Sequence, residues 1–280
     1  MEPVLKILLL LLIRIQCCHQ ERFQCHQEPN VKVQWHHEGS CVQENSDQHS
    51  FLELDSDSLL NYTVLELVNA TFAQFGSNHF QVIPASVTTL SVYFGNVSEV
   101  YFLSGSLHSL SILDTDLHRF FVAEQENQAL TSLEIRSKAL GTVPFSIEYL
   151  KELQKLTLRG CNLTMVDVKQ FGGLSNLVEL DLAENSIFTL DIPVNIRVGS
   201  LRKLFIEDNF LTEVKNFPMA FPRLRTLGLY NNRWYCDWVA EVRKRIMTAW
   251  IVVYGRDVDC EKRIYHGGLC CVRRPDRVSK

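Results

Sequence analysis

The chain has 280 residues, of which 46% are hydrophobic and 21% are charged, and its net charge is −4. This composition is typical of a globular protein and excludes a disordered chain, while 13 Gly and 8 Pro are too few for a collagen-like or low-complexity one. The small negative charge gives no general attraction to nucleic acid or to an acidic membrane.

The first residues have the pattern of a secretion signal. Lys6 precedes an unbroken apolar run from Ile7 to Ile13, which polar residues then end. The run is far shorter than the roughly 20 apolar residues that a membrane-spanning helix needs. We therefore expect a signal peptide over residues 1–19, no membrane span, and a secreted, extracellular protein. The candidate glycosylation sites, four Asn-x-Ser/Thr triplets, are Asn61, Asn69, Asn96 and Asn162.

Two cysteines predict a disulfide-bonded cap before the body of the chain. Cys25 and Cys41 flank a segment around Trp35 that alternates like a strand. Repeat arrays expose apolar core at their ends, and disulfides commonly hold small caps over such ends in an oxidising compartment. A Cys25–Cys41 bridge would close an N-terminal cap within residues 20–61.

Residues 62–230 are built from a repeat with the frame L-x-x-L-x-L-x-x-N-x-L. Its second leucine recurs eight times at a spacing of about 23 residues, inside the 20–29 range of leucine-rich repeats. Each repeat buries its apolar side only against its neighbours, so the strands should form a parallel sheet on the inside of a curve. We therefore predict an α/β leucine-rich repeat solenoid. The second leucines are Leu65, Leu90, Leu110, Leu133, Leu156, Leu180, Leu204 and Leu227.

The ninth position of the repeat is usually Asn, because its amide satisfies backbone groups in the turn after the strand. The last three repeats keep it, at Asn185, Asn209 and Asn232. Cys161 takes the same position one repeat earlier. We therefore predict that Cys161 is a buried thiol in the core rather than a nucleophile or half of a bridge.

The third, fifth and seventh positions of each strand should face the concave side, because the fourth and sixth point into the core. Eight strands about 4.8 Å apart span roughly 35 Å, which suits a protein surface or a glycan better than a small-molecule pocket. Arg136 and Arg159 share one column in adjacent repeats and should lie side by side. This face is the best candidate for binding. Its candidate residues are Tyr93, Leu113, Arg136, Arg159, Phe205, Glu207 and Tyr230.

Residues 231–280 should form a C-terminal cap with four cysteines. Cys236 can pair with Cys260 or with one of the adjacent Cys270 and Cys271, whereas a bridge between those two neighbours is strained. Pairing the remainder within the chain is then awkward. One of Cys260, Cys270 and Cys271 is therefore a candidate for an intermolecular disulfide and a disulfide-linked dimer. A fully intramolecular cap is the alternative.

The combined pattern resembles the mosquito leucine-rich repeat immune proteins, in a secreted form without a coiled coil. The pattern consists of the signal peptide, the cap at Cys25 and Cys41, about eight repeats, the N-x-W-x-C-x-W segment from Asn232 and the double cysteine at Cys270. The chain departs from the family where Trp238 replaces the second cysteine of a C-x-C cap, and where no heptad helices follow.

This resemblance implies a protein of innate immunity that circulates in the haemolymph. Family members form disulfide-linked pairs and keep complement-like thioester-containing proteins soluble. The implied partners are therefore thioester-containing proteins or another leucine-rich repeat protein, with microbial surfaces as further targets.

Two other classes of function compete with this one. An extracellular adhesive, matrix or receptor-like binding module without an immune role would have the same repeats. An enzyme is disfavoured, because the sequence has no G-x-S-x-G, no H-E-x-x-H and no phosphate-binding glycine loop. The histidine spacing fits no standard zinc site. We predict no catalytic residues, no metal and no cofactor.

Overall fold

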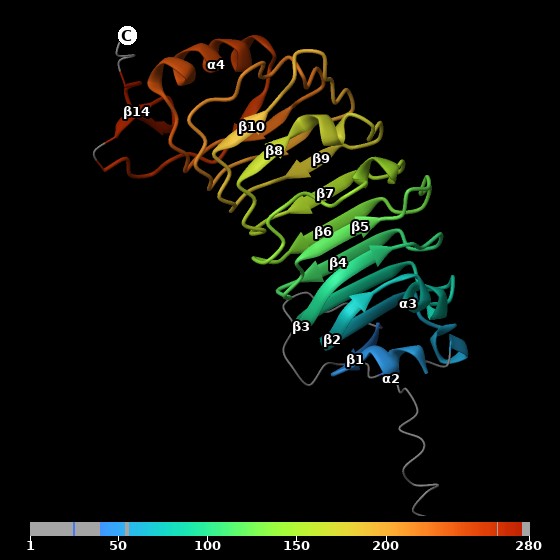
Figure 1. Cartoon of the computed structure of the whole chain (residues 1–280). Helices are drawn as coiled ribbons and strands as arrows, with labels where there is room; N and C mark the ends of the chain where they lie inside the picture. The colour runs from blue at the N-terminus through green and yellow to red at the C-terminus, as the bar shows by residue number, and fades with distance from the viewer. Residues whose placement is uncertain (1–24, 26–39, 54–55, 262, 276–280) are drawn as a thin grey trace, which may run out of the picture.

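The computed structural model describes residues 25, 40–53, 56–261 and 263–275. These residues form an elongated, curved solenoid with β1 near one end and the helix α4 near the other (Figure 1). The predicted leucine-rich repeat solenoid is confirmed, together with disulfides near both ends. The predicted signal peptide lies outside the described residues.

A parallel sheet forms one side of the solenoid, because each repeat contributes a strand with the same apolar pattern. β5 (Arg119–Val122) pairs with the second half of β3 and lies off the main path. The main path runs in the order β1 (Cys41–Glu44), β2 (Val64–Phe75), β3 (Thr89–Phe102), β4 (Ser109–Leu113), β6 (Ser132–Arg136), β7 (Lys155–Leu158), β9 (Glu179–Asp181), β11 (Lys203–Phe205), β12 (Thr226–Gly228) and β13 (Val252–Tyr254).

The second leucines of the eight repeats stand opposite one another across this sheet, from Leu65 to Leu227. Each of them is at most 1% exposed, so they form one continuous apolar column. Burial of such surface is the main force that favours the folded chain. The register continues into both caps, since Cys41, which is buried, pairs with Leu65, and Val253, which is 39% exposed, pairs with Leu227.

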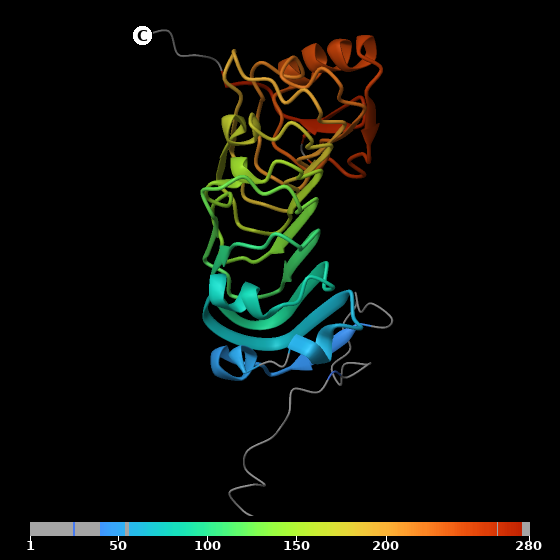
Figure 2. The ribbon, with the colours of Figure 1, turned by 90° about the vertical axis from the view of Figure 1, so that its right-hand side faces the viewer.

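The first long strands differ from the later ones. β2 and β3 have 12 and 14 residues, and they curve from the main sheet towards the opposite side of the solenoid (Figure 2). Gly95 makes their close approach possible, because its φ is +80° and a Cβ there would lie 2.2 Å from the carbonyl oxygen of Ala70.

The side opposite the main sheet carries short elements, which face the viewer in Figure 1. There β8 (Met165–Asp167) pairs with β10 (Thr189–Asp191) in parallel. The remaining short helical elements are α2 (Gln48–Leu52), α3 (Ser77–Val82) and the 3-10 turns η1 (Ser56–Leu59), η2 (Ile147–Tyr149) and η3 (Val168–Phe171).

Two tryptophans close the C-terminal end of the core. Trp234 is fully buried and its indole N–H donates to the carbonyl of Leu229 at 2.7 Å. Trp238, in α4 (Cys236–Thr248), stacks on it at 4.3 Å between ring centroids and donates to the carbonyl of Val214 at 3.1 Å. The hairpin of β14 (Ile264–His266) and β15 (Leu269–Cys271) completes the cap.

Cys161 is the buried thiol that its place in the repeat predicts. The residue is fully buried and unbonded to another cysteine, and its Sγ lies 3.2 Å from the carbonyl oxygen of Ile135. Burial raises the pKa of the thiol to about 11. The side chain is therefore a core group rather than a nucleophile.

Candidate binding face

We call the outward side of the main sheet, opposite the leucine column, the concave face. One of its columns runs through the register partners Asp181, Phe205, Gly228 and Tyr254. The other column holds the remaining predicted residues. They are Tyr93, Leu113, Arg136, Arg159, Glu207 and Tyr230.

Tyr93 and Leu113, two of the predicted residues of this face, are almost fully buried. Tyr93 is 3% exposed and Leu113 is 5% exposed. Both pack with Val42 and Val68 in a small apolar cluster on this face, separate from the main core. The sequence pattern assigned the direction of these side chains, but it missed the apolar neighbours that β1 and β2 bring beside them. The exposed part of the concave face therefore lies nearer the C-terminus.

Arg159 joins three carboxylates on that part of the face. Its guanidinium lies 2.8 Å from Glu184, 3.4 Å from Asp181 and 4.0 Å from Glu207. The arginine side chain is 26% exposed, so water screens these ion pairs only in part. Arg136 lies beside Arg159, because Ile135 and Leu158, the residues just before the two arginines, are register partners in β6 and β7. Three carboxylates thus surround the guanidinium of Arg159, and Arg136 adds a second positive charge beside it.

Glu207 is the most buried of these charged residues, with 2% of its surface exposed. Its carboxylate lies over Gly228, because a Cβ at that glycine would be 1.9 Å from Oε2. No described residue hydrogen-bonds to Oε2. Burial, with smaller contributions from Asp181 and Asp208, raises the pKa of Glu207 to about 7, against the opposing effect of Arg159. The carboxyl group can therefore change its charge near neutral pH.

Aromatic rings border this carboxylate. Phe205 and Tyr254 stand on either side of Gly228 in the register, with ring centroids 6.1 Å apart and planes at 84°. Tyr230 lies against the backbone of Gly255, where a Cβ would be 2.5 Å from its ring. The repeat frame did not predict a role for Tyr254, because β13 follows the last recognised repeat and lacks its leucines. The spacing of Val253 after Leu227 was the signal that β13 continues the sheet.

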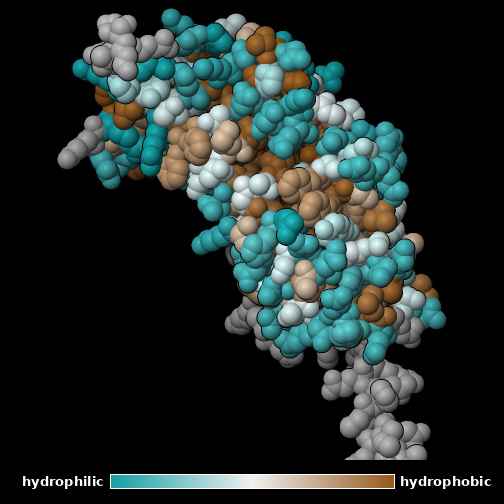
Figure 3. Space-filling model, in the orientation of Figure 1, coloured by the Kyte–Doolittle hydropathy of each residue, from teal (hydrophilic) through white to brown (hydrophobic). Residues whose placement is uncertain are grey.

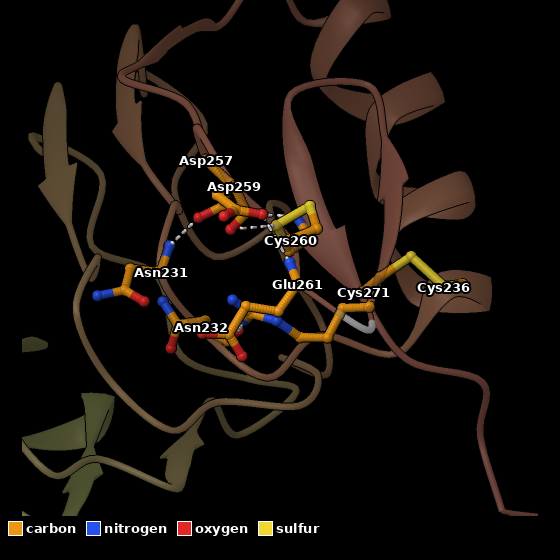
Figure 4. Close-up of a disulfide and its surroundings, with 10 residues drawn as sticks. Asn231, Asn232, Cys236, Asp257, Asp259, Cys260, Glu261 and Cys271 are labelled. Atoms are coloured by element: carbon orange, nitrogen blue, oxygen red, sulfur yellow. Dashed lines mark hydrogen bonds between the residues drawn. A yellow bond between two sulfur atoms is a disulfide. The ribbon is translucent and has the colours of Figure 1, made fainter.

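The structure pairs the cap cysteines within the chain, as Cys25–Cys41 near the N-terminus and as Cys236–Cys271 and Cys260–Cys270 in the C-terminal cap. Figure 4 shows the C-terminal cap, with Cys236, Cys260 and Cys271 labelled. The intermolecular bridge considered for Cys260, Cys270 or Cys271 is therefore not what the structure shows. The reason is the geometry of β15, where successive side chains point to opposite sides of the strand. Adjacent Cys270 and Cys271 thus reach two different partners without strain between them.

Asp257 ties this cap to the last repeat. Its Oδ1 accepts the backbone N–H of Asn231 at 2.7 Å and its Oδ2 accepts that of Cys270 at 2.5 Å (Figure 4). The residue is 7% exposed, so both bonds are shielded from water. The cap therefore has hydrogen bonds to the end of the last repeat in addition to its two internal disulfides.

The other predicted features have these positions. The side chains of the four sequon asparagines, Asn61, Asn69, Asn96 and Asn162, are exposed, and their glycosylation stays a prediction. Across the described residues, no group of three or more His, Cys, Asp and Glu side chains is arranged to hold a metal ion. No helix in the described part of the chain has the length and apolar character to cross a membrane.

Known proteins share this repeat. The family model described as leucine-rich repeat matches residues 151–211. Leucine-rich repeat-containing protein 3 of Danio rerio is 32% identical over 114 residues, which are 40% of this chain and 41% of that protein. Leucine-rich repeat and WD repeat-containing protein 1 of Xenopus laevis is 39% identical over 75 residues, 25% of this chain and 10% of that protein. The chain thus spans less than half the length of either relative.

Solved structures with the same architecture cover most of the chain. Human 5T4, also named Wnt-activated inhibitory factor 1 or trophoblast glycoprotein, has a TM-score of 0.57 at 21% identity, covering 79% of this chain and 84% of that one. A chain of the LRIM1/APL1C complex has a TM-score of 0.51 at 16% identity, covering 84% of this chain and 51% of that one. The repeat match, the leucine column and these likenesses show that the chain has the leucine-rich repeat fold.

Proposed function

We propose that this chain is a secreted leucine-rich repeat protein of innate immunity that binds other proteins through its concave face. The observation that carries the proposal is the Arg159 cluster beside Glu207, bordered by Phe205 and Tyr230. Arginine and aromatic side chains at partly shielded positions are the groups that most often dominate protein–protein binding energy. A curved sheet of this length also presents them to a broad surface rather than to a small molecule.

The extracellular location is supported by the three disulfides between described cysteines, since such bonds persist mainly in oxidising compartments. We assign residues 1–19 as the signal peptide, 20–61 as the N-terminal cap, 62–230 as the repeats and 231–280 as the C-terminal cap. The resemblance to mosquito immune proteins supports the partners, which are complement-like thioester-containing proteins, another leucine-rich repeat protein or a microbial surface. The similar structure of LRIM1 with APL1C is itself that of a complex.

To test the proposal, the amount of these partners that the protein captures is compared between the unmodified chain and variants of the concave face. The protein, secreted from insect cells, is immobilised and exposed to haemolymph, and the bound thioester-containing and leucine-rich repeat proteins are quantified by mass spectrometry. Arg159→Glu and Phe205→Ala should each reduce the captured amount at least about tenfold, because each removes a central contact worth roughly 1.4 kcal/mol or more.

The matched control is Lys169→Glu, which reverses an exposed charge on η3, outside the main sheet. It should leave capture unchanged. Equal capture by all variants would remove the concave face from the proposal. Retention on tissue matrix without any haemolymph partner would favour the adhesive or receptor-like module instead.

A further inference from the structure

A cavity of about 360 Å³ lies away from the concave face, where α3 meets the ends of β3 and β5. Its size is within the range of small-ligand sites. The rings of Tyr101, Phe102 and Phe121 supply its apolar wall, and amides of Gln74 and Asn78 are among its polar groups. None of the residues that line it has an acidic or a Lys or Arg side chain. A ligand that fits this lining is uncharged, with an apolar face and polar edges.

One wall of the cavity belongs to a stack of aromatic rings. Tyr101 lies 4.7 Å from Phe121 between ring centroids, with planes 14° apart, and Phe121 lies 5.0 Å from Phe145, with planes 17° apart. The stack follows the register, since these residues pair in successive repeats. Tyr101 is 38% exposed and Phe145 is 45% exposed. Figure 3 shows apolar side chains gathered over the part of this surface that carries β5 and β8.

The stack ends at Tyr101 because the preceding repeat has a glycine there. Phe75 pairs with Val100, so Gly76 takes the place beside Tyr101. A Cβ built on Gly76 would meet only the Cβ of Tyr101, at 3.9 Å. The backbone of Gly76 is extended, with φ at −128°, so the glycine is not required by conformation. Its effect is to leave the outer side of Tyr101 without a fourth ring.

His79 is one of the residues that line the same cavity. It is 5% exposed, and its Nδ1 accepts the backbone N–H of Gly76 at 3.1 Å, which assigns the ring proton to Nε2. Nε2 has no hydrogen-bond partner among the described residues. Burial lowers the pKa of His79, so the ring is neutral at pH 7. The side chain therefore adds a neutral, largely buried ring to the lining and no charge.

We propose that this cavity binds a neutral pyranose ring of a glycan. The apolar C–H face of the sugar lies on the free side of Tyr101, where a fourth ring of the stack is missing. Its hydroxyl groups exchange hydrogen bonds with the amides of Gln74 and Asn78. This site is independent of the concave face and of the proteins proposed to bind there.

The experiment uses the secreted chain and three neutral oligosaccharides, namely laminarihexaose, chitohexaose and maltohexaose. Binding is followed by saturation-transfer NMR and quantified by calorimetry. We expect saturable binding of at least one of them. Gly76→Phe should weaken it at least tenfold, because the new ring stacks on Tyr101 and fills the space for the sugar. This variant should fold, since nothing else lies within 4 Å of the added Cβ.

Gly105→Phe is the matched control, because it adds the same ring at an exposed glycine that does not line the cavity. It should bind as the unmodified chain does.

Three results would overturn the proposal. The first is that none of the oligosaccharides binds, and the second is that Gly76→Phe binds as tightly as the unmodified chain. The third is that the neutral aromatic probe N-acetyl-phenylalaninamide binds and displaces the sugar, which would make the cavity a site for an aromatic side chain of a protein.

Discussion

The side-chain carbonyl of Asn185 accepts the backbone N–H of Cys161 at 2.9 Å, one repeat earlier in the chain. It also accepts the N–H of Leu163 at 3.0 Å, while its own NH₂ donates to the carbonyls of Leu158, Leu182 and Ala183. One buried amide thus satisfies five backbone groups in the turns of two repeats. This bonding explains why the repeat keeps Asn at this position.

Replacing Asn185 by Ala should lower the free energy of unfolding by roughly 2–4 kcal/mol, because it leaves several buried backbone groups without partners. Urea unfolding followed by circular dichroism measures the change. Asn176→Ala is the control, since Asn176 makes one side-chain hydrogen bond, to the carbonyl of Lys151, at a half-buried position. It should cost about 1 kcal/mol. Equal losses for the two variants would contradict this account of Asn185.

Glu207 should make the protein less stable as the pH rises. Its folded-state pKa is about 7, whereas the ordinary value is 4.5. Between these values the folded chain keeps a proton that the unfolded chain has lost, so stability falls as pH increases through this window. Glu207→Gln removes the titrating group and resembles the protonated form.

The melting temperature of Glu207→Gln should therefore be close to that of the unmodified chain at pH 4.5 and above it at pH 8. At pH 8 the difference should be on the order of 1–3 kcal/mol in unfolding free energy. Glu184→Gln, at an exposed position, should show no such dependence. A constant difference across this pH range would mean that Glu207 does not hold its proton in the folded state.

The thiol of Cys161 should be unreactive in the folded protein. Burial raises its pKa to about 11, so little thiolate forms at pH 8, and the residue is inaccessible to reagents. After removal of the signal peptide, Ellman's reagent should detect no thiol in the native chain and one in the denatured, unreduced chain. A second thiol in denaturant, or a dimer that reductant separates, would contradict the pairing within the chain.

The two C-terminal disulfides should contribute unequally to stability. Cys236–Cys271 closes 35 residues and Cys260–Cys270 closes 10. Loop-closure entropy alone gives about 4 and 3 kcal/mol for loops of these lengths. The double Ser variant of the Cys236–Cys271 pair should therefore unfold at the lower urea concentration. The opposite order would show that the short loop stabilises the cap by contacts rather than by restricting the unfolded chain.

The repeat spacing predicted the main sheet well, because the leucine column depends on local periodicity that a sequence displays directly. The column from Leu65 to Leu227 lies in the predicted register. The extra strand β13 was missed as a part of the sheet, since Val253 takes the leucine position without the rest of the frame.

The candidate site was predicted less well. Position in a strand gives the direction of a side chain but not what lies next to it, so the frame placed Tyr93 and Leu113 on the concave face without predicting their burial in a cluster with Val42 and Val68. The sequence also did not reveal the role of Gly228 in placing the carboxylate of Glu207. A missing side chain there makes room for the carboxylate of Glu207 from the neighbouring strand.

The unequal strand lengths give the solenoid unequal mechanical strength. β2 and β3 have 12 and 14 residues and are paired from Val64 and Thr89 to Phe75 and Val100, whereas β9, β11 and β12 have three residues each. The C-terminal cap, which follows these strands, is cross-linked by the Cys236–Cys271 disulfide. A load applied along the long axis should therefore part the molecule first between β9 and β12, where the paired strands are shortest. The N-terminal repeats would then stay folded under this load, and the later repeats would separate first.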